Sequence, residues 1–300
     1  MQKNSLLPPV EWAQAAIVFA ANQTARMKSL NIIGGGRVGS TLGRLWHASG
    51  SYRVQDLLTT SVQTAEAAIG FIGAGHAATA LADMRAADVW MLAVPDRQIA
   101  AVAAALAQTA TAGQASMAFH CSGALASAEL APLSALGWQV GSAHCLLSFA
   151  NPETALQQFA GTPCALEGDP RAVTELETSF AHIGAQCFVL AAQHKLLYHA
   201  GAVFATNFLP VLQALAEQLW LESGVPANVV ARLNTTLLQN AVDNILALGP
   251  AGALTGPAAR GDLALVTRQG QAVAQWNATA GQAYVALSQL ASQLAATRLP

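Results

Sequence analysis

Three glycines near the start of the chain have the spacing of a pyrophosphate-binding loop. Gly34, Gly36 and Gly39 match the pattern G-x-G-x-x-G, and they stand between an apolar run and a helical pattern. In this setting the first glycine permits a tight turn, the second lets the backbone approach the pyrophosphate, and the third lets the helix lie close to the strand. We therefore predict a dinucleotide-binding loop; the alternative is an ordinary tight turn. The second glycine-rich stretch, 73–78, follows a helical pattern and is expected to be a loop.

The residues after the second predicted strand favour NADP over NAD. An NAD site usually places a carboxylate about twenty residues past the glycine loop, whereas this chain has Thr60 and Ser61 there. Both hydroxyls can hydrogen-bond a 2′-phosphate, Arg37 can supply positive charge, and Val38 lies in the same loop. Asp56 stands too early for this role and is expected at the surface or at a sheet edge. NADP is therefore the predicted cofactor, and NAD is the alternative.

Polar side chains stand at the ends of two later strands. Ser122 and His144 occupy these ends, and the carboxyl ends of strands line the ligand crevice of a doubly wound sheet. A neutral imidazole there can accept a proton as hydride leaves a carbon, and the hydroxyl can bind the same oxygen. The alternative for His144 is an ordinary satisfied polar group. Val94 and Pro95 end another buried strand, where the proline either turns the chain over the cofactor or only stops the strand.

A long predicted helix offers two further polar groups. His199 and Asn207 are separated by eight positions, so one helix face can hold both. They can present an imidazole and an amide to a substrate, and the alternative is a buried polar pair with a surface cluster. His194 and His199 are poorly spaced for one helical face, and no carboxylate is nearby in the sequence. No metal site is therefore expected.

The elements that must position these residues change character near residue 190. Strands are predicted at 30–33, 54–59, 89–94, 116–121, 139–144, 162–167 and 186–190, with helices between them at 39–49, 64–69, 99–110 and 171–183. This alternation predicts an α/β fold with a doubly wound, mostly parallel sheet. Beyond it the patterns predict helices at 193–223, 226–248 and 271–295, with a loop at 249–261. We therefore expect a dinucleotide-binding domain at 27–190 and an all-helical domain at 191–300.

The first 26 residues are expected to be an extension. They carry a short apolar patch interrupted by two prolines and a glutamate, which makes a poor signal peptide. Met27 follows directly, so either the natural start lies there or residues 1–26 are an appendage. The alternative is an extra helix on the surface of the domain.

The composition excludes several classes of protein. Hydrophobic residues make up 53% of the 300 residues and charged residues 10%, which excludes intrinsic disorder. A formal net charge of −2 lacks the electrostatic footprint of a nucleic-acid binder. The longest apolar stretch, 200–220, is interrupted by polar residues and a proline, so no membrane span is expected. The four cysteines form no CxxC pair and are expected to be free thiols in a reducing cytoplasm.

Taken together, the motifs resemble a known family. The chain from about 29 to 295 is similar to uncharacterised Rossmann-like oxidoreductases whose C-terminal half is a helical domain of unknown function. The resemblance rests on Gly34-Gly35-Gly36-Arg37-Val38-Gly39, Ala93-Val94-Pro95-Asp96, His120-Cys121-Ser122-Gly123, His144 with Ser148-Phe149, Thr206-Asn207-Phe208-Leu209, and Leu254-Thr255-Gly256-Pro257 with Arg260-Gly261-Asp262. Relatives include pyrroline-5-carboxylate reductase, prephenate dehydrogenase and the β-hydroxyacid dehydrogenases. The resemblance implies NADP use and a homodimer whose helical domains pack together.

The resemblance also bears on the site residues. Prephenate dehydrogenases carry a serine and a histidine at the same two strand ends, which supports Ser122 and His144. Cys145 stands where a proline usually follows that histidine. Val203 stands where β-hydroxyacid dehydrogenases carry a lysine four residues before Asn207, so their lysine-based mechanism is not expected here.

The predicted function is hydride transfer between NADP(H) and a small hydroxyacid, ketone or imine. His144 would act as acid and base, Ser122 and Asn207 would position the reacting oxygen or nitrogen, and His199 would line the pocket. The main alternative is a dinucleotide-binding sensor or interaction protein without turnover. A third possibility is a flavin or deazaflavin reductase.

Overall fold

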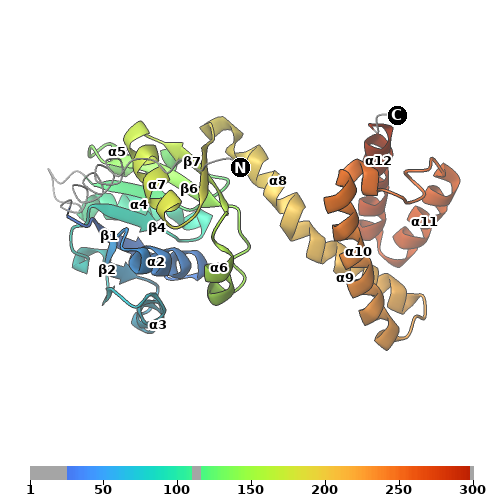
Figure 1. Ribbon diagram of the computed structural model, residues 1–300, viewed down its shortest axis with the longest axis horizontal. Helices are drawn as coiled ribbons and strands as arrows, with labels where there is room; N and C mark the ends of the chain where they lie inside the picture. Colours follow the sequence, from blue (N-terminus) through green and yellow to red (C-terminus); the bar gives the residue numbers. More distant parts are fainter. Residues whose placement is uncertain (1–25, 110–115, 298–300) are drawn as a thin grey trace, which may run out of the picture. The chain divides into compact units, whose positions relative to one another are not determined.

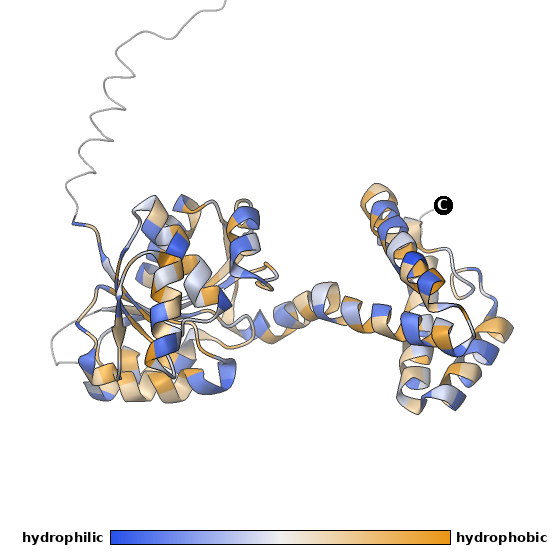
Figure 2. Cartoon of the chain, turned by 90° about the horizontal axis from the view of Figure 1, so that it is seen from below, coloured by the Kyte–Doolittle hydropathy of each residue, from blue (hydrophilic) through white to orange (hydrophobic). Residues whose placement is uncertain are grey.

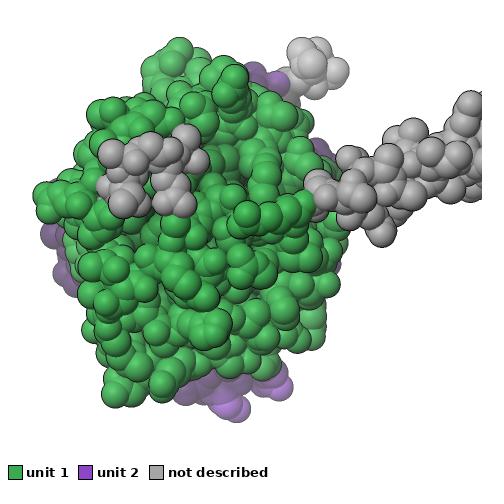
Figure 3. All heavy atoms as spheres, turned by 90° about the vertical axis from the view of Figure 1, so that its left-hand side faces the viewer, with its two compact units in different colours: residues 1–202 green, residues 203–300 purple. Residues whose placement is uncertain are grey.

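The computed structural model describes residues 26–109 and 116–297. The chain divides into two compact units, residues 1–202 and 203–300, which Figure 3 colours separately. All of the extension predicted at 1–26 except Arg26 lies outside the described residues.

Unit 1, which carries the sheet in Figure 1, is built on eight strands in the order β3-β2-β1-β4-β5-β6-β7-β8. Its strands are β1 (Ser29–Ile33), β2 (Arg53–Leu58), β3 (His76–Ala78), β4 (Val89–Leu92), β5 (Met117–His120), β6 (Gln139–Cys145), β7 (Pro163–Gly168) and β8 (Gln186–Val189). All neighbouring strands are parallel except β6 and β7, which are antiparallel. The predicted doubly wound, mostly parallel sheet is therefore confirmed.

Helices cover both faces of this sheet because its strands are apolar on both sides. One face packs against α2 (Arg37–Ser49), α3 (Val62–Ile72) and α7 (Pro170–His182), and the other against α4 (Asp96–Thr109) and the short α5 (Ala131–Ser134). Successive side chains of a strand point to opposite faces. In β1, accordingly, Leu30 and Ile32 belong to the first core and Ile33 to the second.

Trp46 of α2 lies at the centre of the first core. Its ring makes edge contacts with Phe119 and Phe180, and its indole N–H donates to the carbonyl oxygen of Ser179 at 3.0 Å. The ring is fully buried, so this hydrogen bond satisfies a polar atom that would otherwise lose its water partner. The indole thereby ties α2 to α7 on one face of the sheet.

The stretch predicted as a glycine-rich loop is in part a strand. Residues 76–78 form β3, which pairs in parallel with β2. The prediction was wrong because three residues are too few to establish an alternating pattern, and pairing with β2 decides the conformation.

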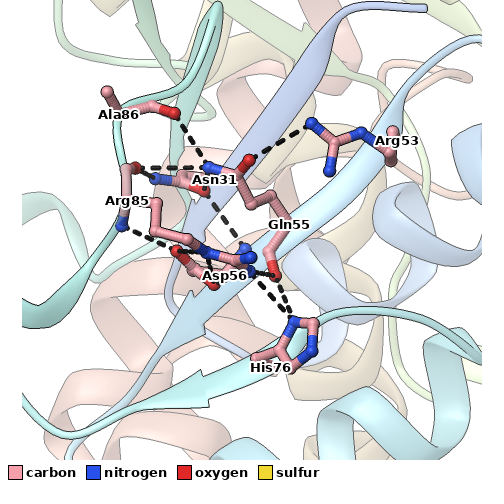
Figure 4. A network of polar contacts seen from close by, with 7 residues as sticks. All are labelled: Asn31, Arg53, Gln55, Asp56, His76, Arg85 and Ala86. Carbon is pink, nitrogen blue, oxygen red and sulfur yellow. Dashed lines mark hydrogen bonds and ion pairs between the residues drawn. The ribbon is translucent and has the colours of Figure 1, made fainter.

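Asp56 is a buried residue, which corrects its expected place at the surface or the sheet edge. Its carboxylate accepts hydrogen bonds from the backbone N–H and the guanidinium of Arg85 (Figure 4). The same network includes Gln55, which donates to the Ala86 carbonyl oxygen at 2.9 Å, and Asn31, which donates to that of Arg85 at 2.6 Å. Burial raises the pKa of Asp56, but the bonds and charge of Arg85 outweigh it and hold that pKa below its usual range. The carboxylate fixes the connection into β4 and is not directed to a cofactor.

Over its described residues, unit 2 has helices joined by turns and loops, and no strand. Its helices are a π-helix η5 (Val203–Asn207), α9 (Phe208–Glu222), α10 (Ala227–Ala253), α11 (Leu263–Trp276) and α12 (Ala278–Ala296). The expected single helix at 271–295 is two helices, because Asn277 has an extended backbone and its side chain caps α12 by accepting from Ala280 N–H at 3.0 Å. The expected loop at 249–261 begins with a helical turn, and Gly249 at φ +71° marks the break.

The units divide between residues 202 and 203, whereas the sequence placed the domain boundary at 190. The difference is the helix α8 (Lys195–Ala202), which belongs to unit 1. Its first residue, Lys195, is buried, and Tyr198 contacts His144 of β6. Packing against the sheet therefore extends the first unit by one helix.

Candidate functional site

The direction of winding reverses between β1 and β4. From β1 the chain continues to β2 and β3 on one side, and β4 and β5 lie on the other. A doubly wound sheet forms its ligand crevice at such a point, beyond the carboxyl ends of the strands. The loops after β1 and β4 touch there, because a Cβ added to Gly34 would lie 2.3 Å from the carbonyl oxygen of Ala93.

The glycine loop has two positions that the fold itself requires and one that is open. Gly34 has φ +107°, and a Cβ on Gly39 would lie 2.0 Å from the carbonyl oxygen of Gly34. Gly36 begins α2 as its N-cap residue, and a Cβ there would meet nothing within 4 Å. The loop thus leaves free space beside a helix N-terminus, which is the cradle that a pyrophosphate needs.

The first turn of α2 is suited to an anion. Arg37, its first residue, is exposed, Val38 is half-buried, and no acidic residue lies in this turn. The partial positive charge of the helix N-terminus is therefore not opposed by a carboxylate of that turn.

The end of β2 places the predicted 2′-phosphate residues at the start of α3. Ser61 is the N-cap residue of α3, and its hydroxyl accepts from the Thr64 N–H at 3.2 Å. Thr60 is exposed. Thr59 donates from its hydroxyl to the Ser61 carbonyl oxygen at 2.7 Å and holds the turn.

Ser122 is buried and its hydroxyl is fully engaged. Its Oγ donates to Asp96 at 2.8 Å and accepts from the N–H groups of Ala124 and Leu125 at 3.2 and 3.0 Å. A hydroxyl offers one donor and two acceptor positions, so this one has no bond left for a substrate. Val94 and Pro95 lead from β4 to Asp96, the first residue of α4. The serine therefore joins the two loops.

His120 fixes the same loop through both of its ring nitrogens. It is fully buried, its Nε2 bonds the Ala126 carbonyl oxygen at 3.0 Å, and its Nδ1 accepts from the Ser122 N–H at 3.2 Å. Burial lowers the pKa of His120, and a neutral ring matches one donating and one accepting nitrogen. The structural role predicted for this residue agrees with these bonds.

His144 and His199 come together around Gly123. The two imidazole rings lie 5.4 Å apart between centroids, and a Cβ on Gly123 would lie 2.5 Å from His199 Nδ1 and 2.8 Å from His144 Nε2. Tyr198 completes the group, since its hydroxyl lies 3.0 Å from His144 Nδ1. His199 Nδ1 is buried without a hydrogen-bond partner, and such an atom calls for one.

The environment keeps His144 neutral. Burial, the neighbouring His199 and the charge of Lys195 lower the pKa of His144 to about 4, against a smaller opposing effect of Asp96. Burial raises the pKa of Tyr198, so its hydroxyl stays protonated near pH 7. A neutral imidazole has one N–H. When Nδ1 carries it and donates to the Tyr198 oxygen, Nε2 can accept a proton, and when the Tyr198 hydroxyl donates to Nδ1, Nε2 carries a proton that it can donate.

Tyr198 and Lys195 are members of this group that were not among the predicted site residues. Lys195 is 1% exposed, and its Nζ donates to the Ser122 carbonyl oxygen at 3.1 Å and to Ser142 Oγ at 2.9 Å. The available signal was their spacing, because residues 195, 198 and 199 fall on one face of a helix whose His199 was already a candidate.

Asn207, the remaining predicted site residue, belongs to unit 2. It is exposed, and its Oδ1 accepts from the Thr206 hydroxyl at 3.1 Å. The helix expected at 193–223 is interrupted by the π-helix η5, which ends at Asn207. The predicted common face of His199 and Asn207 therefore does not follow from α-helical spacing, because a π-turn inserts a residue.

No metal-binding group is present in the described part of the chain. Over residues 26–109 and 116–297, no group of three or more His, Cys, Asp or Glu side chains is arranged to hold a metal ion. Within the same ranges, no helix is both long and apolar enough to cross a membrane.

Two family models match the chain in succession. Residues 16–144 match a Rossmann-like domain. Residues 162–291 match a domain of unknown function, DUF2520. The chain joins a Rossmann-like domain to a DUF2520 domain. This is the family that the motifs predicted, and no curated protein matches the chain closely enough to add a function.

Solved structures share this fold over most of the chain. A protein of Thermotoga maritima is 26% identical and has a TM-score of 0.70, with 89% of this chain and 98% of that one covered. A variant imine reductase from Myxococcus stipitatus, in complex with NAD⁺, is 17% identical with a TM-score of 0.58, covering 89% and 94%. A 1-pyrroline-5-carboxylate reductase from Streptococcus pyogenes is 13% identical with a TM-score of 0.57, covering 89% and 99%.

Proposed function

We propose that this protein is an oxidoreductase that transfers hydride between a nicotinamide dinucleotide and a small hydroxyacid, ketone or imine. The observation that carries the proposal is the glycine loop at the point where the sheet reverses. Gly34 and Gly39 are held by the fold, while the position of Gly36 is open beside a helix N-terminus. An oxidoreductase in complex with NAD⁺ shares the fold.

The loop residues fit the cofactor's phosphates. Gly34, Gly36 and Gly39 would hold the pyrophosphate with the first N–H groups of α2, and Val94 and Pro95 would cover it from the end of β4. We further propose NADP as the preferred cofactor, because Thr60 and Ser61 follow β2 where an NAD site usually carries a carboxylate. Arg37, the exposed first residue of α2, would add positive charge.

The chain's own residues would handle the proton. The bound dinucleotide supplies the hydride-transfer chemistry. His144 would accept or return the proton of the reacting oxygen or nitrogen at Nε2, and Tyr198 would hold the ring through Nδ1. The buried and unpartnered Nδ1 of His199 would bind the same substrate group. Ser122 would act by positioning the loop, since its hydroxyl is saturated, and Asn207 stays the proposed substrate-positioning amide.

The substitution Gly36→Ala tests the cofactor site without disturbing the fold. A methyl group there meets no protein atom within 4 Å, so the melting temperature should stay within about 2 °C, which is below the effect of about 1 kcal/mol of destabilisation. NADPH affinity, measured by calorimetry or fluorescence, should fall at least about tenfold, because the methyl group would occupy the pyrophosphate space.

Gly70→Ala is the matched control, since Gly70 is exposed in α3 and also has open space around it. It should leave NADPH binding unchanged. If Gly36→Ala binds NADPH as tightly as the unmodified protein, the loop does not hold the dinucleotide. Absence of binding of both NADPH and NADH to the unmodified protein would reject the proposed function altogether.

A dinucleotide-binding sensor is the second candidate. It is favoured by the low pKa of His144, about 4, which makes this imidazole a weak base near neutral pH. Binding of NADPH without any absorbance change at 340 nm across hydroxyacids, ketones and imines would support the sensor.

We also propose that the helical unit forms a homodimer. Only four of residues 203–297 are buried, namely Val230, Gly270, Ala280 and Gly281. Apolar residues are distributed along all its longer helices (Figure 2). Its exposed large hydrophobic residues are Phe204, Phe208, Leu209, Val211, Leu212, Leu221, Leu237, Val242, Ile245, Leu246, Leu248, Leu263, Val285, Leu287 and Leu290. A unit of this size normally buries at least about 60% of the surface that its unfolded chain exposes, so we assign these exposed apolar residues to an interface with a second copy of the chain.

The proposed compartment is the cytoplasm. All four cysteines are free thiols. Cys145 and Cys164 lie with their sulfur atoms 3.4 Å apart on adjacent strands and are not bonded. Thiols this close tend to oxidise outside a reducing compartment.

A further inference from the structure

Lys195 is a buried cation without a carboxylate partner. Its side chain is almost wholly inaccessible. Within the described residues, the two ion pairs closer than 4.0 Å join Lys28 to Glu175 and Arg85 to Asp56, so Lys195 has none. Its ammonium donates to two neutral oxygens, the carbonyl of Ser122 and the hydroxyl of Ser142.

Two carboxylates, those of Glu167 and Asp96, are hydrogen-bonded to the serines that Lys195 contacts and not to Lys195 itself. Ser142 Oγ donates to Glu167 at 2.9 Å, and Ser122 Oγ donates to Asp96 at 2.8 Å. A buried ammonium that is separated from its counter-charges loses hydration that these bonds restore only in part. Stability alone therefore gives no reason for a lysine at position 195.

One of its two bonds holds the turn beside the imidazoles. The carbonyl oxygen of Ser122 belongs to the peptide unit that leads into Gly123. The Cα of Gly123 packs against both His144 and His199, at a distance that leaves no room for a methyl group. Movement of this peptide would therefore disturb the packing of both rings against Gly123.

The lysine also fixes the helix that carries two members of the cluster. Lys195, Tyr198 and His199 stand at positions i, i+3 and i+4 of α8, so they share one face. Tyr198 reaches His144 Nδ1 at 3.0 Å. Anchoring the first residue of α8 sets the rotation of the helix about its axis and so the direction of the other two side chains.

We propose that Lys195 is a positioning residue that pins α8 to the Ser122–Gly123 turn and so holds His144, Tyr198 and His199 as one unit. This inference rests on the proposed function for its meaning in catalysis. Its geometry can be tested without any substrate.

The charge of Lys195 also acts on His144. The groups that face His144 are Tyr198, His199 and Lys195 of α8 and Asp96 of α4. The cation opposes protonation of the imidazole, whereas Asp96 favours it more weakly. Removing the cation should therefore make His144 easier to protonate, an effect that a purely structural anchor would not have.

The experiment compares Lys195→Met with Lys28→Met. Lys28 is exposed, so its variant controls for the loss of a lysine. Imidazole resonances are followed by NMR from pH 3.5 to 8, and His144 is assigned by its loss in His144→Asn. In Lys195→Met we expect the pKa of His144 to rise above its value of about 4 but to stay below the ordinary one, because burial and His199 still lower it. In Lys28→Met it should stay unchanged. An unchanged His144 titration in a folded Lys195→Met variant overturns the proposal.

A measurement on the unmodified protein covers the case in which Lys195→Met does not fold. The sequence has three lysines, Lys3, Lys28 and Lys195. Reductive methylation with ¹³C-formaldehyde and a borane should dimethylate Lys28 and leave Lys195 unmodified until the protein is unfolded. Methylation of Lys195 in the folded protein at the rate of Lys28 contradicts the anchor.

Turnover separates this inference from the proposed function. If a substrate is found, Lys195→Met should lower kcat at least about tenfold while the NADPH Kd stays within about threefold, because the ammonium bonds Ser122 and Ser142 and not the glycine loop. A fall in NADPH affinity equal to the fall in kcat would contradict a positioning role. If no dinucleotide binds at all, the proposed function fails while the NMR and methylation results still decide the anchor.

Discussion

His144 is the residue on which the chemistry of this site depends. It is half-buried at the end of β6, its Nδ1 is bound by a tyrosine hydroxyl, and its Nε2 lies beside Gly123. This nitrogen is the one that the proposed function assigns to the substrate. This sets His144 apart from His120, whose two nitrogens are both engaged within the protein.

Replacement of His144 by asparagine should separate binding from turnover. The amide can still hydrogen-bond Tyr198 but cannot accept a proton at neutral pH. We expect kcat to fall by about 10²–10⁴, while the Kd of NADPH changes by less than about threefold. Stopped-flow absorbance at 340 nm measures the first quantity and calorimetry the second. Unchanged turnover would remove His144 from the mechanism.

The low pKa of His144 also predicts a dependence of stability on pH. The folded value is about 4 and the unfolded value about 6.5, so the unfolded chain binds the proton first. The stabilisation that this neutral ring contributes is present above pH 6.5, falls as the pH is lowered, and is lost once the pH has passed 4. From these values the loss at pH 5 is at most about 2 kcal/mol.

Urea unfolding at pH 7 and pH 5 measures this effect. The unmodified protein should lose more free energy of unfolding between the two conditions than His144→Asn, because only the first can take up that proton. Equal losses in the two proteins would show that His144 is not held neutral by the fold.

The sequence predicted where the polar site residues lie better than it predicted which groups they hydrogen-bond. Ser122, His144 and His199 were found from the ends of strands and the face of a helix, and the structure brings all three to one side of unit 1 through Gly123 and its neighbours. The sequence could not predict that the Ser122 hydroxyl is saturated by Asp96, because these residues meet only when β4 and β5 pair. Asp56 was misplaced for the same reason, since its partner Arg85 follows a strand that has no sequence pattern of its own.

The turn after β5 packs tightly between β6 and α8, because Gly123 lies against His144 and His199. Gly123→Ala would place a methyl group 2.5 Å from His199 Nδ1, and either the rings or α8 must move. Forced overpacking of this kind costs about 1–3 kcal/mol. We expect the melting temperature to fall and the His144 and His199 imidazole resonances to shift.

Gly201→Ala, in helix α8, provides the comparison. A Cβ at this position meets nothing within 4 Å, and alanine favours a helix over glycine by about 0.5–1 kcal/mol. This variant should be as stable as the unmodified protein or more so, with unchanged imidazole resonances. Equal behaviour of the two alanine variants would show that the turn at Gly123 is not tightly packed.

The strands were predicted within two residues at their ends because buried parallel strands form continuous apolar runs bounded by turn residues. The helices after residue 190 were harder, since their caps depend on single side chains such as Asn277 and on Gly249. β3 was missed because it is three residues long. Short elements and helix ends are decided by their neighbours in space rather than by periodicity.

The exposed apolar residues of the helical unit predict that two chains assemble into a homodimer. Light scattering after size exclusion should give twice the chain mass of 30.8 kDa. Leu246 and Leu248 are 80% and 62% exposed, and replacing both with glutamate should dissociate the dimer, because each charge would have to be buried. Leu136→Glu, at a 48% exposed position of unit 1, should leave the mass unchanged. A monomer in the unmodified protein would refute the assembly.

The antiparallel pairing of β6 with β7 has a mechanical consequence for the site. Since β8 runs with β7, the chain reaches α8 from the opposite direction to β6, and Lys195 meets Ser142 while Tyr198 meets His144 two residues further along that strand. The helix and the strand therefore contact each other at two matched positions. One alanine inserted directly after Lys195 would rotate the following residues by about 100°, and the tyrosine and histidine would lose their places while every strand kept its own.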